Sequence, residues 1–574
     1  MRKYTKFLLV GSISIVFSAC NDNTPIHEYQ PVPNSVGNVI SLEQNWTEEM
    51  REAFYFTSQG SHIMPYEWFL YLEQATNDNL FRANDNVTSF RYIPSKPSKS
   101  WNPDGLPVGF VKDVDSDGKE WLGPTCAACH TTQIEYKDTI MRIDGGPAMG
   151  DFTAFNQQLV SAMSITYKEE AKFTRFAKNI LKDKYNTENA SQLRQQLLKQ
   201  TEILAGRNLV NTSKVAYGYA RVDAVGAIFN QVMVQNIDMP SNQRDSNAPV
   251  SYPFLWGTHQ SDVVQWTGFA PNGPFGLGAL IRNGGEVLGV YGEIDIPEDK
   301  SEILYQSSLQ IVNLGKLENW VKDLRSPAWP AKILPAIDPE KASLGKIHYD
   351  QNCLSCHQVI SRENEGEQYK AILILQTEVG TDPTEIEDIG RELDSGRFEG
   401  RKEMQVVGPT IEAKTTGLNP LVNSVTGALF AHPLESIGAI LIENLGKNKD
   451  NALKTLEDYI RQYEEKFQTT KASTSGGTYK SRPLNGIWAT APYLHNGSVP
   501  NLYELLLPAK ERSKEFYVGS LAFDPEKVGF ETKVGDGLFK FSTEIKGNLN
   551  TGHEYAIELD ETQRSELLEY LKTL

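Results

Sequence analysis

The stretch Cys126-Ala127-Ala128-Cys129-His130 has a second copy of the same pattern at Cys353-Leu354-Ser355-Cys356-His357. In both copies two cysteines lie two residues apart and a histidine follows directly. This spacing lets each thiol bond to one vinyl group of the same porphyrin and places the histidine beneath the iron. A redox-active cysteine pair does not need the histidine, and a zinc site usually needs a second ligand pair close by. We therefore predict two covalently bound haem c groups, with His130 and His357 as the proximal iron ligands.

The fifth of the five cysteines, Cys20, follows a segment typical of exported proteins. Basic residues open this segment, the apolar run Phe7–Phe17 is too short to span a bilayer, and small residues directly precede Cys20. The pattern predicts a bacterial lipoprotein signal peptide at residues 1–20 with Cys20 lipidated; an ordinary signal peptide with an incidental Cys20 is the alternative. We expect an exported, membrane-anchored lipoprotein that faces the periplasm or the cell surface.

Composition excludes several function classes. The 574 residues carry a formal net charge of −17, so the chain lacks the clustered basic residues that bind nucleic acid. A hydrophobic content of 40% with 10% aromatic residues is typical of a globular chain with a large core. Membrane attachment is therefore expected through the lipid anchor, and no nucleic-acid partner is expected.

The sixth iron ligands decide between an electron carrier and a catalyst, because a catalyst keeps one coordination position open. After the first motif no histidine occurs before His259, and three methionines follow at plausible distances: Met141, Met149 and Met163. Met163 has apolar neighbours, which favours core packing for it. The sequence therefore allows an open distal face on the first haem.

For the second haem the candidates are Met404, His432 and His495. His495 lies in the stretch Ala489–Pro500, where prolines bracket an Asn-Gly turn and form a rigid loop that could present an imidazole. A structural histidine in a tight turn is an equally good interpretation from spacing alone.

Several stretches resemble one group of proteins, the superfamily of di-haem cytochrome c peroxidases, and most closely its rubber-oxygenase-like branch. The stretch Ala489–Pro500 looks like a motif of the whole superfamily. The pieces that are similar to the rubber-oxygenase-like branch are Asn102–Phe110, Ile143–Met149, Arg221–Ala224, Tyr252–Trp256 and Val264–Trp266. Each piece is moderately specific, but the set occurs in order over most of residues 45–574.

The resemblance implies a mainly α fold with two cytochrome c-like haem domains and long helical and loop-rich insertions. It also implies His130 and His357 as proximal ligands and His495 as the distal ligand of the second haem. Typical di-haem peroxidases use a methionine after this histidine, and here that position is Ala509. This departure favours a reactive first haem and a second haem with two histidine ligands.

The expected organisation follows from proline and apolar spacing. Residues 21–40 read as a tether, residues 41–325 as an N-terminal haem c domain, and residues 326–574 as a C-terminal haem c domain, since several prolines lie near the boundary. Residues 148–239 lack proline and show helical apolar spacing, which predicts a helical insertion. In the C-terminal domain, an early helix with Leu344 and Ile347 and a last helix with Leu567 and Leu571 suit a cytochrome c core.

Three residues of the loop-rich region are candidates for the distal side of the first haem: Trp256, His259 and Trp266. The tryptophans could line a haem pocket or lie between the haems, and a role as aromatic core residues is an equally good interpretation. His259 could be an acid–base group, although lone histidines are more often structural.

One stretch mimics a calcium loop. Asp113–Gly118 copies the start of an EF-hand loop, but the twelfth position is Pro124 where the loop needs glutamate. Calcium is therefore an unsupported additional cofactor, and an acidic turn is the simpler interpretation.

These observations predict an exported di-haem oxidoreductase that activates O₂ or peroxide at the first haem and exchanges electrons at the second. The expected partners are a small redox protein or a quinol-linked electron donor and an apolar organic substrate. The alternative is a non-catalytic di-haem electron-transfer lipoprotein, with a methionine such as Met149 or Met163 on the first haem.

Overall fold

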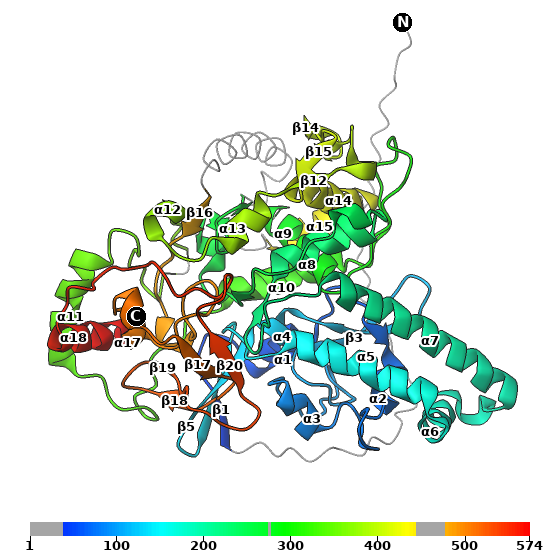
Figure 1. Ribbon diagram of the computed structural model, residues 1–574, viewed down its shortest axis with the longest axis horizontal. Coiled ribbons are helices and arrows are strands. Elements are labelled where there is room, and N and C mark those ends of the chain that lie inside the picture. Colours follow the sequence, from blue (N-terminus) through cyan, green and yellow to red (C-terminus); the bar gives the residue numbers. More distant parts are fainter. Residues whose placement is uncertain (1–37, 274–276, 365, 444–476) are drawn as a thin grey trace, which may run out of the picture.

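The computed structural model describes residues 38–273, 277–364, 366–443 and 477–574 (Figure 1). The predicted signal peptide with Cys20 and residues 21–37 of the predicted tether lie outside these residues. The fold is 40% helix and 16% strand. None of the helices within the described ranges is long and apolar enough to cross a membrane.

The first Cys-x-x-Cys-His motif connects two small sheets. Strand β4 (Glu120–Pro124) leads into the short helix α4 (Cys126–Cys129), which leads into β5 (Thr131–Tyr136). β4 lies between β2 (Met64–Pro65) and β3 (Phe110–Val114), and the second sheet has the order β1 (Asn38–Ser41), β6 (Thr139–Asp144), β5. The motif is therefore held at both ends by backbone pairing. Two short helices, α1 (Glu48–Phe56) and α2 (Tyr66–Tyr71), pack beside these sheets.

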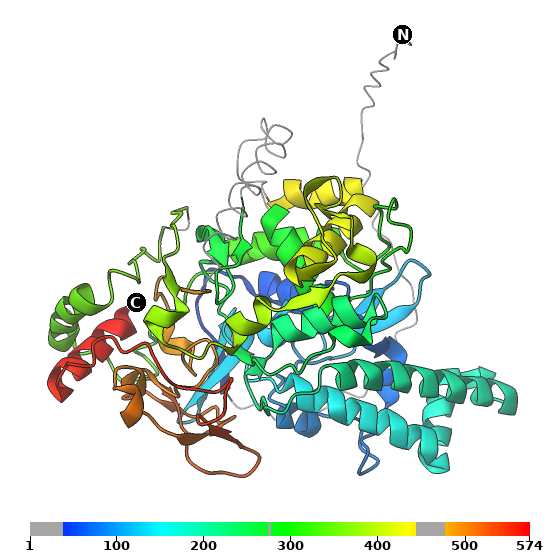
Figure 2. The ribbon, with the colours of Figure 1, turned by 45° about the horizontal axis from the view of Figure 1, so that its top comes forward.

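The region predicted to be helical, residues 148–239, does contain long helices. They are α5 (Phe152–Lys168), α6 (Glu170–Leu181) and α7 (Thr187–Val210), which project together from one end of the molecule in both views (Figures 1 and 2). Their buried residues Phe155, Leu159 and Met163 join a core separate from the larger one. Met163 therefore packs as a core residue, as its apolar neighbours predict.

The middle of the chain folds into a layer of packed helices. Pairs in contact include α8 (Ala224–Asn230) with α9 (Leu277–Gly289), and α10 (Ile311–Asp323) with α15 (Pro433–Glu443); α14 (Leu418–Ala431) also packs on α9. The larger hydrophobic core contains residues from both sides of the expected boundary at residue 326, for example Leu324 and Trp488. The two expected domains thus share one apolar interior.

The last helix packs across the helix that precedes the second motif. α11 (Pro339–Asn352) and α18 (Glu561–Thr573) lie side by side at the other end of the molecule (Figures 1 and 2). Gly345 permits this crossing, because a Cβ atom there would lie 1.9 Å from the carbonyl oxygen of Glu566. The predicted helix pair is confirmed, and Leu567 and Leu571 are buried as expected. Leu344 and Ile347 instead point to solvent.

Short strand pairs account for the departure from a mainly α fold. They include β11 (Leu373–Leu375) with β16 (Thr478–Lys480), and β17 (Glu515–Val518) with β20 (Phe539–Ser542). Segments this short carry too few alternating residues to be distinguished from loops in the sequence. The mainly α prediction is therefore confirmed only in part.

Candidate haem sites

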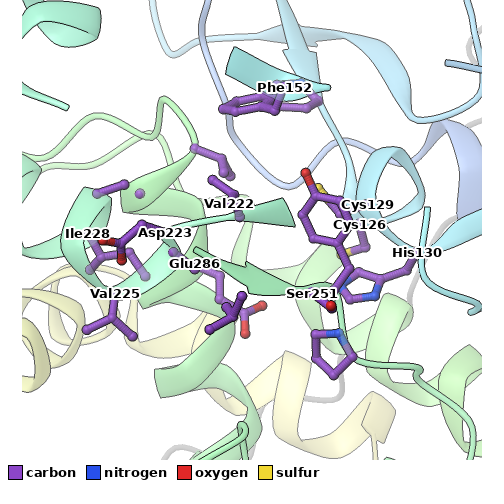
Figure 3. A pocket seen from close by; sticks show the side chains of 18 of the residues that line it. Cys126, Cys129, His130, Phe152, Val222, Asp223, Val225, Ile228, Ser251 and Glu286 are labelled. Carbon is purple, nitrogen blue, oxygen red and sulfur yellow. The ribbon is translucent and has the colours of Figure 1, made fainter. Parts of the chain in front are cut away.

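A cavity of about 560 Å³ lies directly beside the first motif (Figure 3). Cys126, Cys129 and His130 form part of its wall, and the rest comes mainly from α5, α8, α9 and the loop around Tyr252. Its volume lies within the range of about 300–1,000 Å³ that is typical of cofactor and small-molecule sites.

The motif is fixed tightly against its surroundings. The Thr125 side chain caps α4 by accepting a hydrogen bond from the Ala127 amide, and its hydroxyl donates to the Tyr55 carbonyl at 3.1 Å. Gly109, with a φ of +84°, lies so close that a Cβ atom would be 2.1 Å from the Ala128 nitrogen. The loop before β3 therefore forms a rigid backing for the motif.

The protonation of the motif suits covalent haem attachment. Burial lowers the pKa of His130 to about 4, so the imidazole is neutral, which is the form that binds a metal. The His130 Nδ1 has no hydrogen-bond partner of normal geometry within the described residues. The backbone of Pro253 lies close enough to oppose part of the decrease in the His130 pKa. Burial also raises the pKa of Cys129 to about 12 and raises that of Cys126. Thiols of this kind are unlike a redox-active pair, whose pKa values are lowered.

A carboxyl group that the sequence analysis did not single out lies in the same cavity. Glu286 on α9 lines the cavity (Figure 3), and the Gln265 side-chain amide donates to its Oε1 at 2.7 Å. Burial raises the pKa of Glu286, with the nearby Arg282 opposing the shift. The available signal was a glutamate in the largely apolar run Leu277–Gly289, which also contains Arg282 and Asn283.

Among the described residues, the wall of this cavity contains no methionine and no histidine besides His130. Met141 and Met149 belong to the larger hydrophobic core instead. Within the described part of the chain, the cavity wall thus offers no methionine and no second histidine as a further iron ligand.

The three distal-side candidates are separated by the structure. Trp266 lines the cavity, and its indole N–H donates to the Ser251 carbonyl at 2.9 Å. Trp256 and His259 line a separate small cleft, and the Trp256 indole N–H donates to the Asn485 carbonyl at 2.7 Å while its ring stacks on Phe254. A catalytic role for any of the three stays a prediction.

The second motif has different surroundings. The His357 Nδ1 lies 2.8 Å from the Arg482 carbonyl oxygen, so Nδ1 carries the hydrogen and Nε2 is free to bind a metal. The Tyr349 hydroxyl donates to the His357 carbonyl at 2.7 Å. The ring of His553 lies 6.2 Å from the ring of His357, measured between centroids. Two imidazoles that share one iron, each bonded at about 2 Å, have their ring centres about 6 Å apart.

His553 also has the protonation of a ligand. Burial lowers its pKa to about 3, and its Nδ1 has no hydrogen-bond partner within the described residues. Sequence reasoning missed it because it lies in an irregular segment without a motif, shortly before α18.

His495, the expected distal ligand, is engaged elsewhere. Its Nε2 lies 3.0 Å from the Tyr479 hydroxyl, and that hydroxyl donates to the Asp382 carbonyl at 2.7 Å. The hydroxyl has one hydrogen, so it accepts from the Nε2–H of His495, which occupies that nitrogen. The structure therefore brings His553, and not His495, beside His357.

The stretch that mimics a calcium loop is the turn between β3 and β4. The carboxylate of Asp115 accepts from the amides of Asp117 and Lys119 and from the Trp121 indole, and Asp113 lies 2.8 Å from His62. Within the described ranges, no group of three or more acidic, histidine or cysteine side chains could hold a metal ion.

Comparison with known proteins gives a family and a domain. Residues 477–517 match the family model described as RoxA-like, cytochrome c-like, and a cytochrome c-like domain implies covalent haem c. The chain is 30% identical to the uncharacterized protein y4iJ of Sinorhizobium fredii, over 94% of each chain. It is 23% identical to a second protein of that organism, the uncharacterized protein y4iM, over 56% of this chain and 63% of that protein. The matched segment contains Tyr479, Arg482 and His495.

Proposed function

We propose, from the premise that the chain belongs to the same protein family as y4iJ of Sinorhizobium fredii, that it is a di-haem oxidoreductase in which O₂ or peroxide reacts at the first haem. One observation carries the proposal: the cavity that contains Cys126, Cys129 and His130 also contains the buried carboxyl of Glu286, and its described wall offers no second histidine or methionine. An electron carrier would place such a ligand there.

Cys126 and Cys129 would hold the first haem with His130 as its protein ligand, and Cys353 and Cys356 would hold the second between His357 and His553. When bound, a haem with one protein ligand offers a position for O₂ or peroxide, whereas a haem with two imidazoles exchanges single electrons. His553 replaces His495 in this assignment because of its distance from His357.

Glu286 would move the proton. Gln265 holds Oε1, which leaves Oε2 to accept a proton from a peroxide molecule and to return it to the departing oxygen. The raised pKa of Glu286 brings the group closer to neutral pH, where a general acid–base group works best. Trp266 and Tyr252 contribute aromatic surface to the cavity wall.

The test compares Glu286→Gln with Glu385→Gln. Glu385 is also a buried glutamate, its pKa is raised to about 8, and it does not line the cavity. With haem content confirmed, stopped-flow mixing with peroxide is expected to be about 10²–10⁴-fold slower in Glu286→Gln and unchanged in Glu385→Gln. Two low-spin haems in the parent protein, unchanged by peroxide or O₂ even after half-reduction, would leave the electron-carrier alternative.

We also propose export with lipidation at Cys20, on the basis of the basic and apolar segments before it. External electrons would come from a small redox protein or a quinol-linked donor, and an apolar organic compound would be the oxidised substrate. Cys20→Ser is expected to move the protein from the membrane fraction to the soluble fraction; retention in the membrane would refute the anchor.

A further inference from the structure

The segment Lys480–Arg482 places two cations in the first cavity. Residue 480 ends β16 and residue 482 follows two positions later, so their side chains share one side of the extended chain. Both line the cavity beside Cys126 and His130. The residues between and before them face away: Tyr479 contacts His495, and the Ser481 hydroxyl donates to the Ile372 carbonyl.

Neither cation has a carboxylate partner within the described residues. The Lys480 ammonium donates to the Val263 carbonyl at 3.2 Å, and the Arg482 guanidinium donates to the Phe254 carbonyl at 3.0 Å and lies over the Phe254 ring. By contrast, Arg282 in the same wall is paired with Glu318. Removal from water disfavours both charges, lowering the pKa of Arg482 to about 10 and that of Lys480 far below its usual range. A counterion would stabilise both charges in this place.

We propose that Lys480 and Arg482 bind the two propionate carboxylates of the first haem; this rests on the proposed haem at Cys126, Cys129 and His130. Two anionic groups match two otherwise unpaired cations. An arginine–carboxylate pair is charge-assisted and can use two parallel hydrogen bonds, which fixes the orientation of the bound group.

The same segment reaches the second site through its backbone. The Arg482 carbonyl accepts from the Nδ1–H of His357, while the Arg482 side chain enters the first cavity. Arg482 is therefore a positioning residue for both haems, whereas Lys480 contacts only the first. A change in the Arg482 side chain is expected to alter both sites.

The test is a spectroelectrochemical titration of the haem-loaded full chain in Lys480→Gln, Arg482→Gln and Arg482→Lys. The control is Arg401→Gln, because Arg401 is a buried cation held only by carbonyl oxygens and lies outside the cavity wall. A nearby cation favours the reduced haem, so removing it lowers the reduction potential. A tenfold change in the reduction equilibrium, which is about 59 mV for one electron, is expected at the first haem in both glutamine variants.

At the second haem a smaller decrease is expected in Arg482→Gln alone, and Arg482→Lys is expected to keep most of the parent potential at the first haem. First-haem potentials equal to those of Arg401→Gln in both glutamine variants, with two haems attached, would overturn the assignment. If Arg482→Gln loses haem, Lys480→Gln alone decides by the same criterion. These potentials do not depend on reaction with peroxide, so a failure of the proposed reaction would be seen separately.

Discussion

The two Cys-x-x-Cys-His motifs have the same cysteine and histidine spacing but lie in different surroundings. His130 faces a cavity of about 560 Å³ and has a buried carboxyl in the same wall, but no second imidazole among the described lining residues. His357 is held at Nδ1 by the Arg482 carbonyl and has His553 at 6.2 Å. In the proposed function, the pentapeptide attaches the haem, and the residues around the histidine determine how that haem reacts.

Each difference has a clear origin in the fold. The first motif lies between two sheets and opens toward the helical layer, so the space before His130 is bounded by α9 and by the loop around Tyr252. The second motif follows α11, and the segment just before α18 returns to it and brings His553. The crossing of α11 and α18 therefore positions His553, the proposed ligand, as well as packing a core.

The largest effects are expected when the cysteine pair of each motif is removed in turn. Cys126→Ala with Cys129→Ala is expected to leave one haem per chain and to abolish the reaction with peroxide. Cys353→Ala with Cys356→Ala is also expected to leave one haem, and that chain should still bind peroxide but lack a stored second electron. Haem stoichiometry from the pyridine haemochrome spectrum and stopped-flow kinetics measure both. A chain with one haem in the parent protein would contradict the two-site picture.

A narrower test changes the spin state of the second haem. His553→Ala is expected to convert the second haem from low-spin to high-spin, because only His357 would then bind its iron. His495→Ala is expected to leave it low-spin, since Nε2 of His495 is occupied by Tyr479. Low-temperature electron paramagnetic resonance distinguishes the two states. Loss of the low-spin signal in His495→Ala, but not in His553→Ala, would restore the ligand that the resemblance implies.

Some features of the structure could be predicted from the sequence and others could not. Apolar spacing predicted the helices after the first motif, with Leu159 and Met163 buried. Covalent haem attachment at the two motifs stays a prediction from their fixed local spacing. Residues brought to the two sites from distant segments could not be identified from the sequence: His553 has no motif around it, and Glu286 looks like an ordinary helix residue. Their roles depend on tertiary proximity, which local periodicity does not encode.

The stretches that resemble known proteins contain residues that stabilise the fold as well as residues of the candidate sites. Arg221 and Asp223 belong to a stretch that resembles the rubber-oxygenase-like branch, yet here they hold the fold together. Arg221 is buried and donates to the Asn548 side chain at 2.8 Å, and Asp223 caps α8 through the Gly226 amide at 2.7 Å. His495 lies in the turn that Arg221 also contacts, through the Asn496 carbonyl. A shared stretch can thus mark packing around a site as well as the site itself.

A smaller effect is expected from a substitution next to Glu286 at the first site. Gln265→Leu removes the hydrogen bond to Glu286 Oε1, which favours the ionised carboxylate, so the pKa of Glu286 is expected to rise further. A hydrogen bond to a charged group contributes about 1.5–3 kcal/mol, which corresponds to about one to two pKa units. Because the carboxylate accepts the proton, the peroxide reaction is lost as pH falls through this pKa. The acid limb of the rate profile should therefore move to higher pH, and it should be missing in Glu286→Gln. An unshifted limb in Gln265→Leu would exclude Glu286 as the titrating group.

The smallest expected effect is confined to the second region. Asp560 caps α18 by accepting from the Gln563 amide at 2.9 Å, and the Gln563 side chain accepts from the Asp560 amide at 3.0 Å. Asp560→Ala is expected to lower the free energy of unfolding by about 1 kcal/mol, because an orphan amide of the first helical turn loses its partner. Thr562→Ala, an exposed change in the same turn, is the matched control. Urea unfolding followed by the haem spectra should show the second haem lost at lower urea in Asp560→Ala than in Thr562→Ala, with the reaction of the first haem unchanged below the transition. If both haems shift together, the shared core that includes Leu324 and Trp488 makes the two regions one cooperative unit, and the difference between the sites is one of chemistry alone.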